Sequence, residues 1–212
     1  GPDPAFNFLL RTALEEARYY NVPNDNIERA IKKGAGGGDQ ENYEPVRYEG
    51  YGPGGVAVIV DALTNNRTRT AGDVRLAFSR AECRMGVTGA VAHQFEHKGV
   101  ITVAAPAKDE DRLIEAALNA GADDVKPSDD ATDDTPPTWI VLTEPTKFLT
   151  VRDDLKKAGF TIAESELDML PLNTVQVRGQ TAKDLLELTD GLEDLEDVKK
   201  VYTNADFPEP IE

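Results

Sequence analysis

Two histidines four residues apart are the residues in this sequence that most directly suggest chemistry. The run from His93 to His97 matches H-x-x-E-H, a pattern with which one class of zinc peptidase holds its metal. Two such histidines share one ion only on a helix, where side chains four apart lie about 5–6 Å from each other. Gly89 and Gly99 bracket the segment, and its residue types favour a strand, along which four residues span about 13 Å. We therefore expect no zinc site here.

The glycines at positions 50, 52, 54 and 55 suggest a second kind of site, a phosphate-binding loop. In a P-loop or dinucleotide site the glycines follow a strand and open a helix, whose N-terminal amides hold the phosphate. Here they precede the apolar run Val56–Val60, and the lysine of a P-loop is missing, so we expect a structural β-turn. With two histidines and one cysteine, Cys83, no nucleophile and base pair has sequence support. We expect a non-enzymatic protein with no catalytic residue, metal or cofactor.

Arginines gather directly after this apolar run, in the loop 65–70 and along a helix expected at 71–81. A guanidinium fork binds phosphate through two hydrogen bonds and is weakly hydrated, which favours nucleic-acid contact. The alternative is a solvated helix face on which the arginines pair with acids such as Asp73 and Glu82. Two lysines end an earlier helix, where they also complement its dipole. The candidate nucleic-acid contacts are Asn65, Asn66, Arg67, Arg69, Arg75, Arg80, Arg84, Lys32 and Lys33.

Charge is distributed unevenly along the chain. The sequence has 39 acidic and 23 basic residues, a net charge of −16. Residues 1–38 are balanced and residues 39–105 are nearly neutral, whereas residues 106–212 carry a net charge of −15. Because nucleic-acid binding depends on cations that displace counterions, phosphate is repelled by such a segment. Any nucleic-acid contact is therefore expected in the first half, or in sequence that is not present here.

Hydrophobic periodicity predicts an α+β fold. A glycine-rich segment at 34–40 is expected to be a flexible hinge after two N-terminal helices. Beyond it, helices separated by pairs of strands indicate split β-α-β units, with helices packed on one face of antiparallel sheets. Thr181 is expected to cap the last helix. The predicted helices are 8–20, 26–33, 71–81, 109–120, 146–158 and 181–192, and the predicted strands are 46–51, 55–63, 91–103, 139–143, 163–170, 174–177 and 198–202.

Three separated segments carry a resemblance to a known family. They are the run 22–34, the run 48–70 with its glycines and arginines, and the run 88–101 with Thr88-Gly89-Ala90-Val91. In this order they resemble the YebC/PmpR family, described as probable transcriptional regulators and similar to mitochondrial translational activators of cytochrome oxidase. The resemblance extends over essentially the whole chain, as far as the run 197–204.

The resemblance implies a domain organisation and a missing segment. It implies a helical N-terminal domain with hinge at 1–38, a discontinuous middle domain at 39–103 and 171–212, and an inserted acidic domain at 104–170. Both α/β domains are expected to be of the split β-α-β, ferredoxin-like type with antiparallel sheets. Family members usually begin with a basic helical segment, and this chain starts at the linker Gly1-Pro2-Asp3-Pro4. We therefore expect that the most basic part is absent.

The resemblance also implies a function, a non-enzymatic regulator of gene expression. Its partner would be DNA, RNA or the ribosome, bound mainly through the missing basic segment and the Arg67–Arg84 region. The alternative is a protein–protein adaptor whose acidic domains bind a basic partner without touching nucleic acid. No apolar stretch approaches the roughly 20 residues of a membrane span, which predicts a soluble protein. Its location would be the cytoplasm of a bacterium, or alternatively the mitochondrial matrix.

Overall fold

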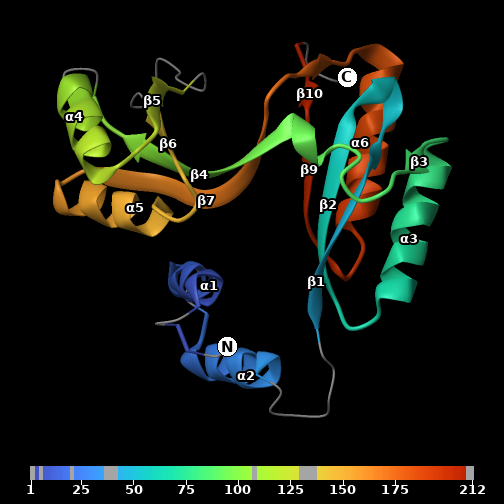
Figure 1. Ribbon diagram of the computed structural model, residues 1–212, viewed down its shortest axis with the longest axis horizontal. Coiled ribbons are helices and arrows are strands. Elements are labelled where there is room, and N and C mark those ends of the chain that lie inside the picture. Colours follow the sequence, from blue (N-terminus) through green and yellow to red (C-terminus); the bar gives the residue numbers. More distant parts are fainter. Residues whose placement is uncertain are drawn as a thin grey trace. The chain divides into compact units, whose positions relative to one another are not determined.

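Figure 1 shows the computed structural model, which describes residues 3–4, 7–19, 22–35, 43–106, 109–128 and 138–208. Most of the predicted hinge at 34–40 lies outside the described residues. The N-terminal part contains two helices, α1 (Phe8–Tyr19) and α2 (Asn24–Gly34). The side chain of Asn7 caps the start of α1, because its Oδ1 accepts a hydrogen bond from the amide of Leu10 at 3.1 Å. No residue of α2 is buried.

The contacts within the chain divide it into two compact units. Unit 1 consists of Gly1–His93 and Asn173–Glu212, and unit 2 is the continuous segment Gln94–Leu172. The second unit therefore begins at 94, whereas the family resemblance implied that the insertion starts at 104. The reason is strand β4 (Phe95–Ala104), which pairs along its whole length with strands of unit 2 and so belongs to that unit.

Unit 1 is built on a four-stranded antiparallel sheet in the order β3-β1-β2-β9. Strands β1 and β2 form a hairpin around the glycine turn, which contains the short 3₁₀ helix η1 (Pro53–Gly55). A separate parallel pair joins β8 and β10. The other elements of the unit are β1 (Glu44–Tyr51), β2 (Ala57–Thr64), α3 (Arg67–Arg80), β3 (Arg84–Met85), β8 (Val175–Gln176), α6 (Gly179–Glu193), β9 (Val198–Thr203) and β10 (Ala205–Asp206). The 3₁₀ turn η2 (Ala92–Gln94) lies at the boundary with unit 2.

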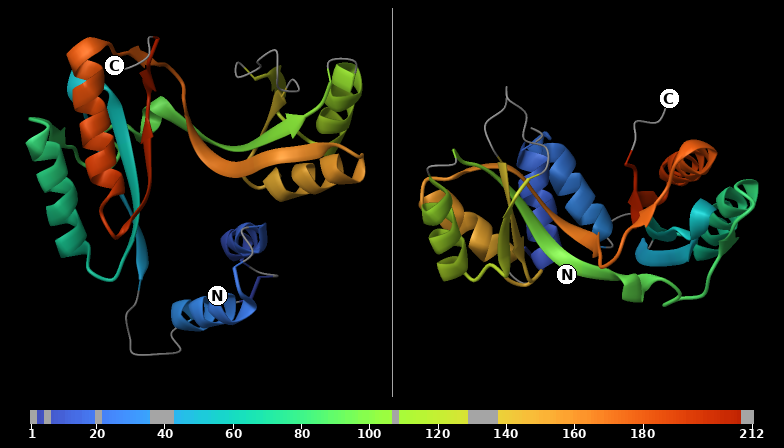
Figure 2. Two further views of the ribbon diagram at one scale, coloured as in Figure 1. Left: turned by 180° about the vertical axis from the view of Figure 1, so that it is seen from behind. Right: turned by 90° about the horizontal axis from the view of Figure 1, so that it is seen from above.

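Helices α3 and α6 cover one face of this sheet. They lie side by side in Figures 1 and 2, where α3 is teal and α6 is orange-red. Phe78 of α3 and Leu185 and Leu192 of α6 are fully buried against alternate residues of β2. Gly50 of β1 allows this packing, because a Cβ there would lie 2.7 Å from the ring of Phe78. The buried apolar residues of this core therefore come from two separate segments of the chain, 56–78 and 177–198.

Unit 2 has the ferredoxin-like order. Its antiparallel sheet runs β5-β6-β4-β7, which places a strand between the two parallel strands of each β-α-β unit. Helices α4 and α5 pack against each other on one face of the sheet (Figure 1). Unit 1 contains one such split unit, β2-α3-β3 with β1 between its strands, but α6 leads instead to the edge strand β9. The further elements of unit 2 are α4 (Glu110–Ala120), β5 (Asp124–Pro127), β6 (Thr138–Thr143), α5 (Phe148–Lys157) and β7 (Thr161–Pro171).

The α+β class with antiparallel sheets is confirmed, while several helix starts differ from the prediction by one to four residues. Helix α3 begins at Arg67 rather than at residue 71, because Asn66 caps it and so brings the first arginines into the helix. Helix α6 begins at Gly179, so the expected cap at Thr181 is wrong. Arg178 occupies the N-cap position there, without a side-chain cap bond. Among the described residues no helix has the length and apolar character needed to cross a membrane.

Gly99 provides a test of the packing in unit 2. A Cβ at this position would lie 2.5 Å from Thr143 Oγ1 and 2.6 Å from Phe148 Cδ2, both in the buried layer between β4 and α5. We expect Gly99→Ala to lower the free energy of unfolding by about 1–3 kcal/mol, since the buried neighbours must move. Urea unfolding followed by the fluorescence of Trp139, the only tryptophan, reports on this unit. Leu118→Ala is the control, because Leu118 is 54% exposed on α4 and should change stability little. Equal midpoints for Gly99→Ala and wild type would contradict this account.

Candidate nucleic-acid interface

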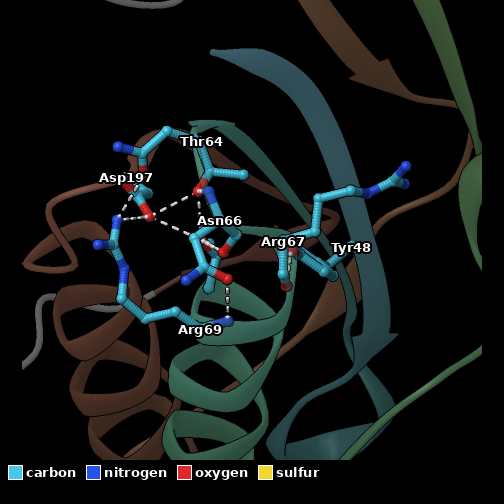
Figure 3. Close-up of polar contacts among 8 residues, drawn as sticks. Tyr48, Thr64, Asn66, Arg67, Arg69 and Asp197 are labelled. Atoms are coloured by element: carbon cyan, nitrogen blue, oxygen red, sulfur yellow. Dashed lines mark hydrogen bonds and ion pairs between the residues drawn. The ribbon is translucent and has the colours of Figure 1, made fainter. Parts of the chain in front are cut away.

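The start of α3 is held by the carboxylate of Asp197, which lies in the connection between α6 and β9. Asp197 Oδ2 accepts hydrogen bonds from Arg69 Nη2 at 2.8 Å, Thr70 Oγ1 at 2.6 Å and Thr64 Oγ1 at 2.9 Å (Figure 3). The Asp197 side chain is only 8% exposed. We call these four residues the Asp197 cluster. It joins the end of β2, the first turn of α3 and the turn before β9.

The cluster stabilises the charged form of Asp197. The hydrogen bond from Arg69, followed by that from Thr70, lowers the pKa of Asp197 to about 2, and burial only partly opposes this. In an unfolded chain an aspartate titrates near 3.9. Because the folded state has the lower pKa, the cluster contributes its full stability above about pH 5 and loses it as the pH falls toward 2.

The two asparagines before α3 have structural partners. Asn66 Oδ1 accepts the amide hydrogen of Arg69 at 3.1 Å, and Asn66 is the N-cap residue. Asn65 Oδ1 accepts a hydrogen bond from Arg69 Nη2 at 3.3 Å. The structure therefore brings Asn65, Asn66 and Arg69 together, and each of them stabilises the beginning of the helix.

The remaining arginines are more available for a ligand. Arg67 is 63% exposed, and its ion pair with Glu44 spans 3.6 Å. Within the part of the chain that the structure describes, no ion pair or side-chain hydrogen bond involves Arg75, Arg80 or Arg84. All three are exposed. The pairing with Asp73 or Glu82 that the sequence left open is thus not formed by these three arginines in the described chain.

The arginines of α3 do not form one stripe. Arg69 and Arg80 are eleven residues apart, close to three helical turns, so they emerge on the same side of the helix as Leu76. Arg75 emerges about 120° away from Arg69. Arg84 follows on β3, the edge strand beside α3. A ligand that contacts all of these residues would have to follow α3 toward β3 rather than bind at a single point.

Lys32 and Lys33 lie in the last turn of α2, as expected. The ammonium group of Lys33 lies 5.4 Å from the centroid of the Tyr43 ring, a cation–π contact. Nothing in the structure assigns these two lysines to the same surface as the arginines of α3.

Glu49 holds the segment that follows β3. Its carboxylate, 3% exposed, accepts hydrogen bonds at 2.8 Å from the amides of Gly89, Val91 and Ala92. Burial acts to raise the pKa of Glu49, but the three backbone hydrogen bonds outweigh it and the pKa is lowered. The segment 89–92 thus forms an amide cradle for an internal carboxylate, in which Gly89 adopts φ 84°.

The H-x-x-E-H match lies at the junction of a 3₁₀ turn and a strand. His93 belongs to η2, while Glu96 and His97 belong to β4, so the helical spacing that the metal pattern needs is not present. In the described part of the chain no three potential ligands are placed to share a metal ion.

Sequence reasoning missed the acidic partners of this region. Asp197 lies 128 residues after Arg69, and no local pattern connects the two. Arg47 and Asp61 form a bidentate pair, with Nε to Oδ1 at 2.6 Å and Nη2 to Oδ2 at 2.7 Å. The hairpin register, in which Arg47 lies opposite Asp61, was the signal that would have revealed this pair.

The fold and the site together define a two-unit α+β protein whose antiparallel sheets are each covered by two helices, with exposed arginines on one of those helices. The chain belongs to the TACO1/YebC family: residues 1–37 match its N-terminal domain and residues 43–205 match its second and third domains. The predicted family is therefore confirmed.

Relatives and a solved structure agree with this assignment. A probable transcriptional regulatory protein of Rubrobacter xylanophilus is 46% identical over 212 residues, which is 100% of this chain and 82% of that protein. One of Trichlorobacter lovleyi is 47% identical over 207 residues, covering 98% and 81%. The crystal structure of a conserved hypothetical protein from Aquifex aeolicus has a TM-score of 0.81 at 43% identity and covers 100% of this chain and 84% of that one.

The Asp197 cluster predicts a specific dependence of stability on pH. At neutral pH we expect Asp197→Asn to lower the free energy of unfolding by about 1–3 kcal/mol, because buried donors lose a charged acceptor. Since the wild type loses this contribution between about pH 5 and 2, the difference between the two proteins should shrink over that range. Urea midpoints measured from pH 7 to 2.5 test this.

Glu196→Gln is the matched control, because Glu196 is an exposed neighbour and should change the midpoint little at any pH. If the difference in urea midpoint between wild type and Asp197→Asn stays constant down to pH 2.5, the cluster does not lower the pKa of Asp197.

Proposed function

We propose that this protein is a non-enzymatic regulator of gene expression that contacts nucleic acid, free or within the ribosome, through the exposed side of α3 and through β3. The observation that carries the proposal is the set of Arg75, Arg80 and Arg84, which have no carboxylate partner in the described chain although the protein has a net charge of −16. Unpaired guanidinium groups in an acidic protein are suited to an external anion. The names of the relatives, probable transcriptional regulatory proteins, support the regulatory role.

The uneven distribution of charge along the chain also favours α3 and β3 as the nucleic-acid interface. Residues 106–212 carry a net charge of −15, whereas residues 39–105 are nearly neutral. A phosphate backbone that approaches within a Debye length, about 8 Å at physiological ionic strength, is repelled by the acidic segment. The arginines of α3 and β3 are therefore the favourable point of approach.

Arg69 is assigned a different role from its neighbours. Its guanidinium group is already paired with Asp197, so replacing it would disturb the fold as well as any contact with a ligand. A test of binding therefore uses Arg75 and Arg80, for which no internal contact is described.

We expect the double charge reversal Arg75→Glu with Arg80→Glu to weaken nucleic-acid binding by roughly tenfold or more. It should also reduce the slope of log Kd against log salt by about 1–2, because each lost phosphate contact removes counterion release. Fluorescence anisotropy with labelled 20-nucleotide RNA and 20-base-pair DNA, from 50 to 200 mM salt, measures both quantities. The matched control is Lys156→Glu with Lys157→Glu on α5, which should leave the slope unchanged. An equal loss in both double variants would contradict the placement of the interface.

The alternative, a protein–protein adaptor, is favoured by one observation, the acidic excess of the C-terminal half. An adaptor would bind a basic protein through carboxylates and would lack salt-dependent binding of either oligonucleotide. Cross-linking in cells followed by identification of the attached molecule separates the two functions. Cross-links from the α3–β3 region to nucleic acid support the proposal, and cross-links only to basic proteins from unit 2 support the adaptor.

A further inference from the structure

We propose that a groove at the end of the unit 1 sheet binds an unpaired nucleobase, so that the nucleic acid is single-stranded where it meets this protein. This inference rests on the proposed function and specifies its ligand. The groove has a volume of about 370 Å³ and lies between the start of β1, the end of β2 and Lys199 of β9. Small-molecule sites typically occupy about 300–1,000 Å³, so the groove has room for a base.

Two successive cross-strand pairs give the groove an apolar part and a polar part. Pro45 lies opposite Leu63, and Arg47 lies opposite Asp61 two residues further along the hairpin. Leu63 is 38% exposed, which is high for a leucine on a sheet. A nucleobase has apolar faces and a polar edge, so its face fits the Pro45–Leu63 pair while its edge meets the Arg47–Asp61 pair.

The Arg47–Asp61 pair offers hydrogen-bond acceptors in a fixed geometry. Each Asp61 oxygen accepts one hydrogen bond from Arg47, at 2.6 and 2.7 Å, and the Asp61 side chain is 31% exposed. A carboxylate oxygen has about two acceptor sites, so each oxygen retains capacity for a second donor. Cytosine, adenine and guanine carry an exocyclic amino group that can donate to it, whereas uracil has a carbonyl at the corresponding position. The groove should therefore prefer an amino-bearing base.

A β-bulge between β2 and β9 places the side chain of Lys199 at the groove. The pairing of β2 with β9 shifts between Asp61 and Ala62, so that Asp61 pairs with Lys200, Ala62 pairs with Val198, and Lys199 is left without a strand partner. Such bulges redirect a side chain and are frequent beside binding sites. Lys199 is exposed and forms no ion pair or side-chain hydrogen bond with any described residue. Its ammonium group is suited to the phosphate attached to the bound base.

The groove adjoins the proposed interface along the chain. Leu63 is followed by Thr64 and Asn65, and Arg67 begins α3 directly afterwards. Asp61 and Leu63 alternate along β2 with the residues that pack under α3, so the groove faces the other side of the sheet. A strand with one base in the groove passes the end of β2 to place its next phosphates at the start of α3. In a duplex the base faces are stacked and their pairing edges are occupied, so a base can enter this groove only from an unpaired segment.

The test uses two matched ligands and two matched variants of the whole chain. Labelled 12-nucleotide oligo(C) and oligo(U) differ at the amino group, and a 12-base-pair duplex serves as the third probe. We expect oligo(C) to bind the wild type several times more tightly than oligo(U) or the duplex. Leu63→Ser should weaken oligo(C) binding about fivefold or more, because a base loses its packing partner, and leave duplex binding unchanged. Leu118→Ser on α4, where Leu118 is 54% exposed, should change none of the three affinities.

Asp61→Asn tests the acceptor role separately, and it should reduce the preference for oligo(C) over oligo(U). Duplex binding as tight as that of oligo(C), or equal effects of Leu63→Ser and Leu118→Ser, would overturn the groove. Binding that depends on Arg75 and Arg80 would still preserve the proposed function. If no probe shows salt-dependent binding, the proposed function itself fails.

Discussion

The architecture of unit 1 depends on one buried carboxylate with three donors. Asp197 comes from the turn before β9, whereas its partners Thr64, Arg69 and Thr70 lie more than 120 residues earlier, at the junction of β2 and α3. A charge that is 8% exposed is costly to bury unless it is paired and hydrogen-bonded, and here one cation and two hydroxyls satisfy it. The cluster therefore fixes both where α3 begins and where β9 enters the sheet. The direction of α3, and with it the position of its exposed arginines, follows from this constraint.

Much of the fold was predictable from the sequence because its signals are local. The 3.6-residue spacing of apolar side chains located the six α-helices of the described residues, and the glycine turn after Tyr51 located the β1–β2 hairpin. The boundary of the insertion was not predictable in this way. In the sequence, strand β4 follows the preceding segment without a linker or a change of composition. Only its pairing with β6 and β7 assigns it to unit 2. Short strands such as β3 and β10 contain two residues each, too few for a periodic signal.

The candidate site was predictable in composition but not in geometry. A run of arginines and asparagines indicates an anion site, but it does not distinguish a guanidinium that pairs internally from one that does not. Arg69 and Arg80 share one side of α3, but only Arg69 is within reach of Asp197, because the turn before β9 ends beside the first turn of the helix. The bulge that leaves Lys199 unpaired has no sequence signature either, since it arises from the register between two strands joined by most of the chain.

The division of the chain also sets an order in which the protein can form during synthesis. Unit 2 is continuous, so every segment that it needs is available once Leu172 has emerged from the ribosome. Unit 1 cannot close its core at that stage, because Leu185, Leu192 and strand β9 have not yet emerged. Until then the apolar face of the β1–β2 hairpin and the inner side of α3 have no cover. The insertion therefore separates in time the emergence of the two parts of unit 1, and the first part waits longer for its core partners than it would in a chain without the insertion.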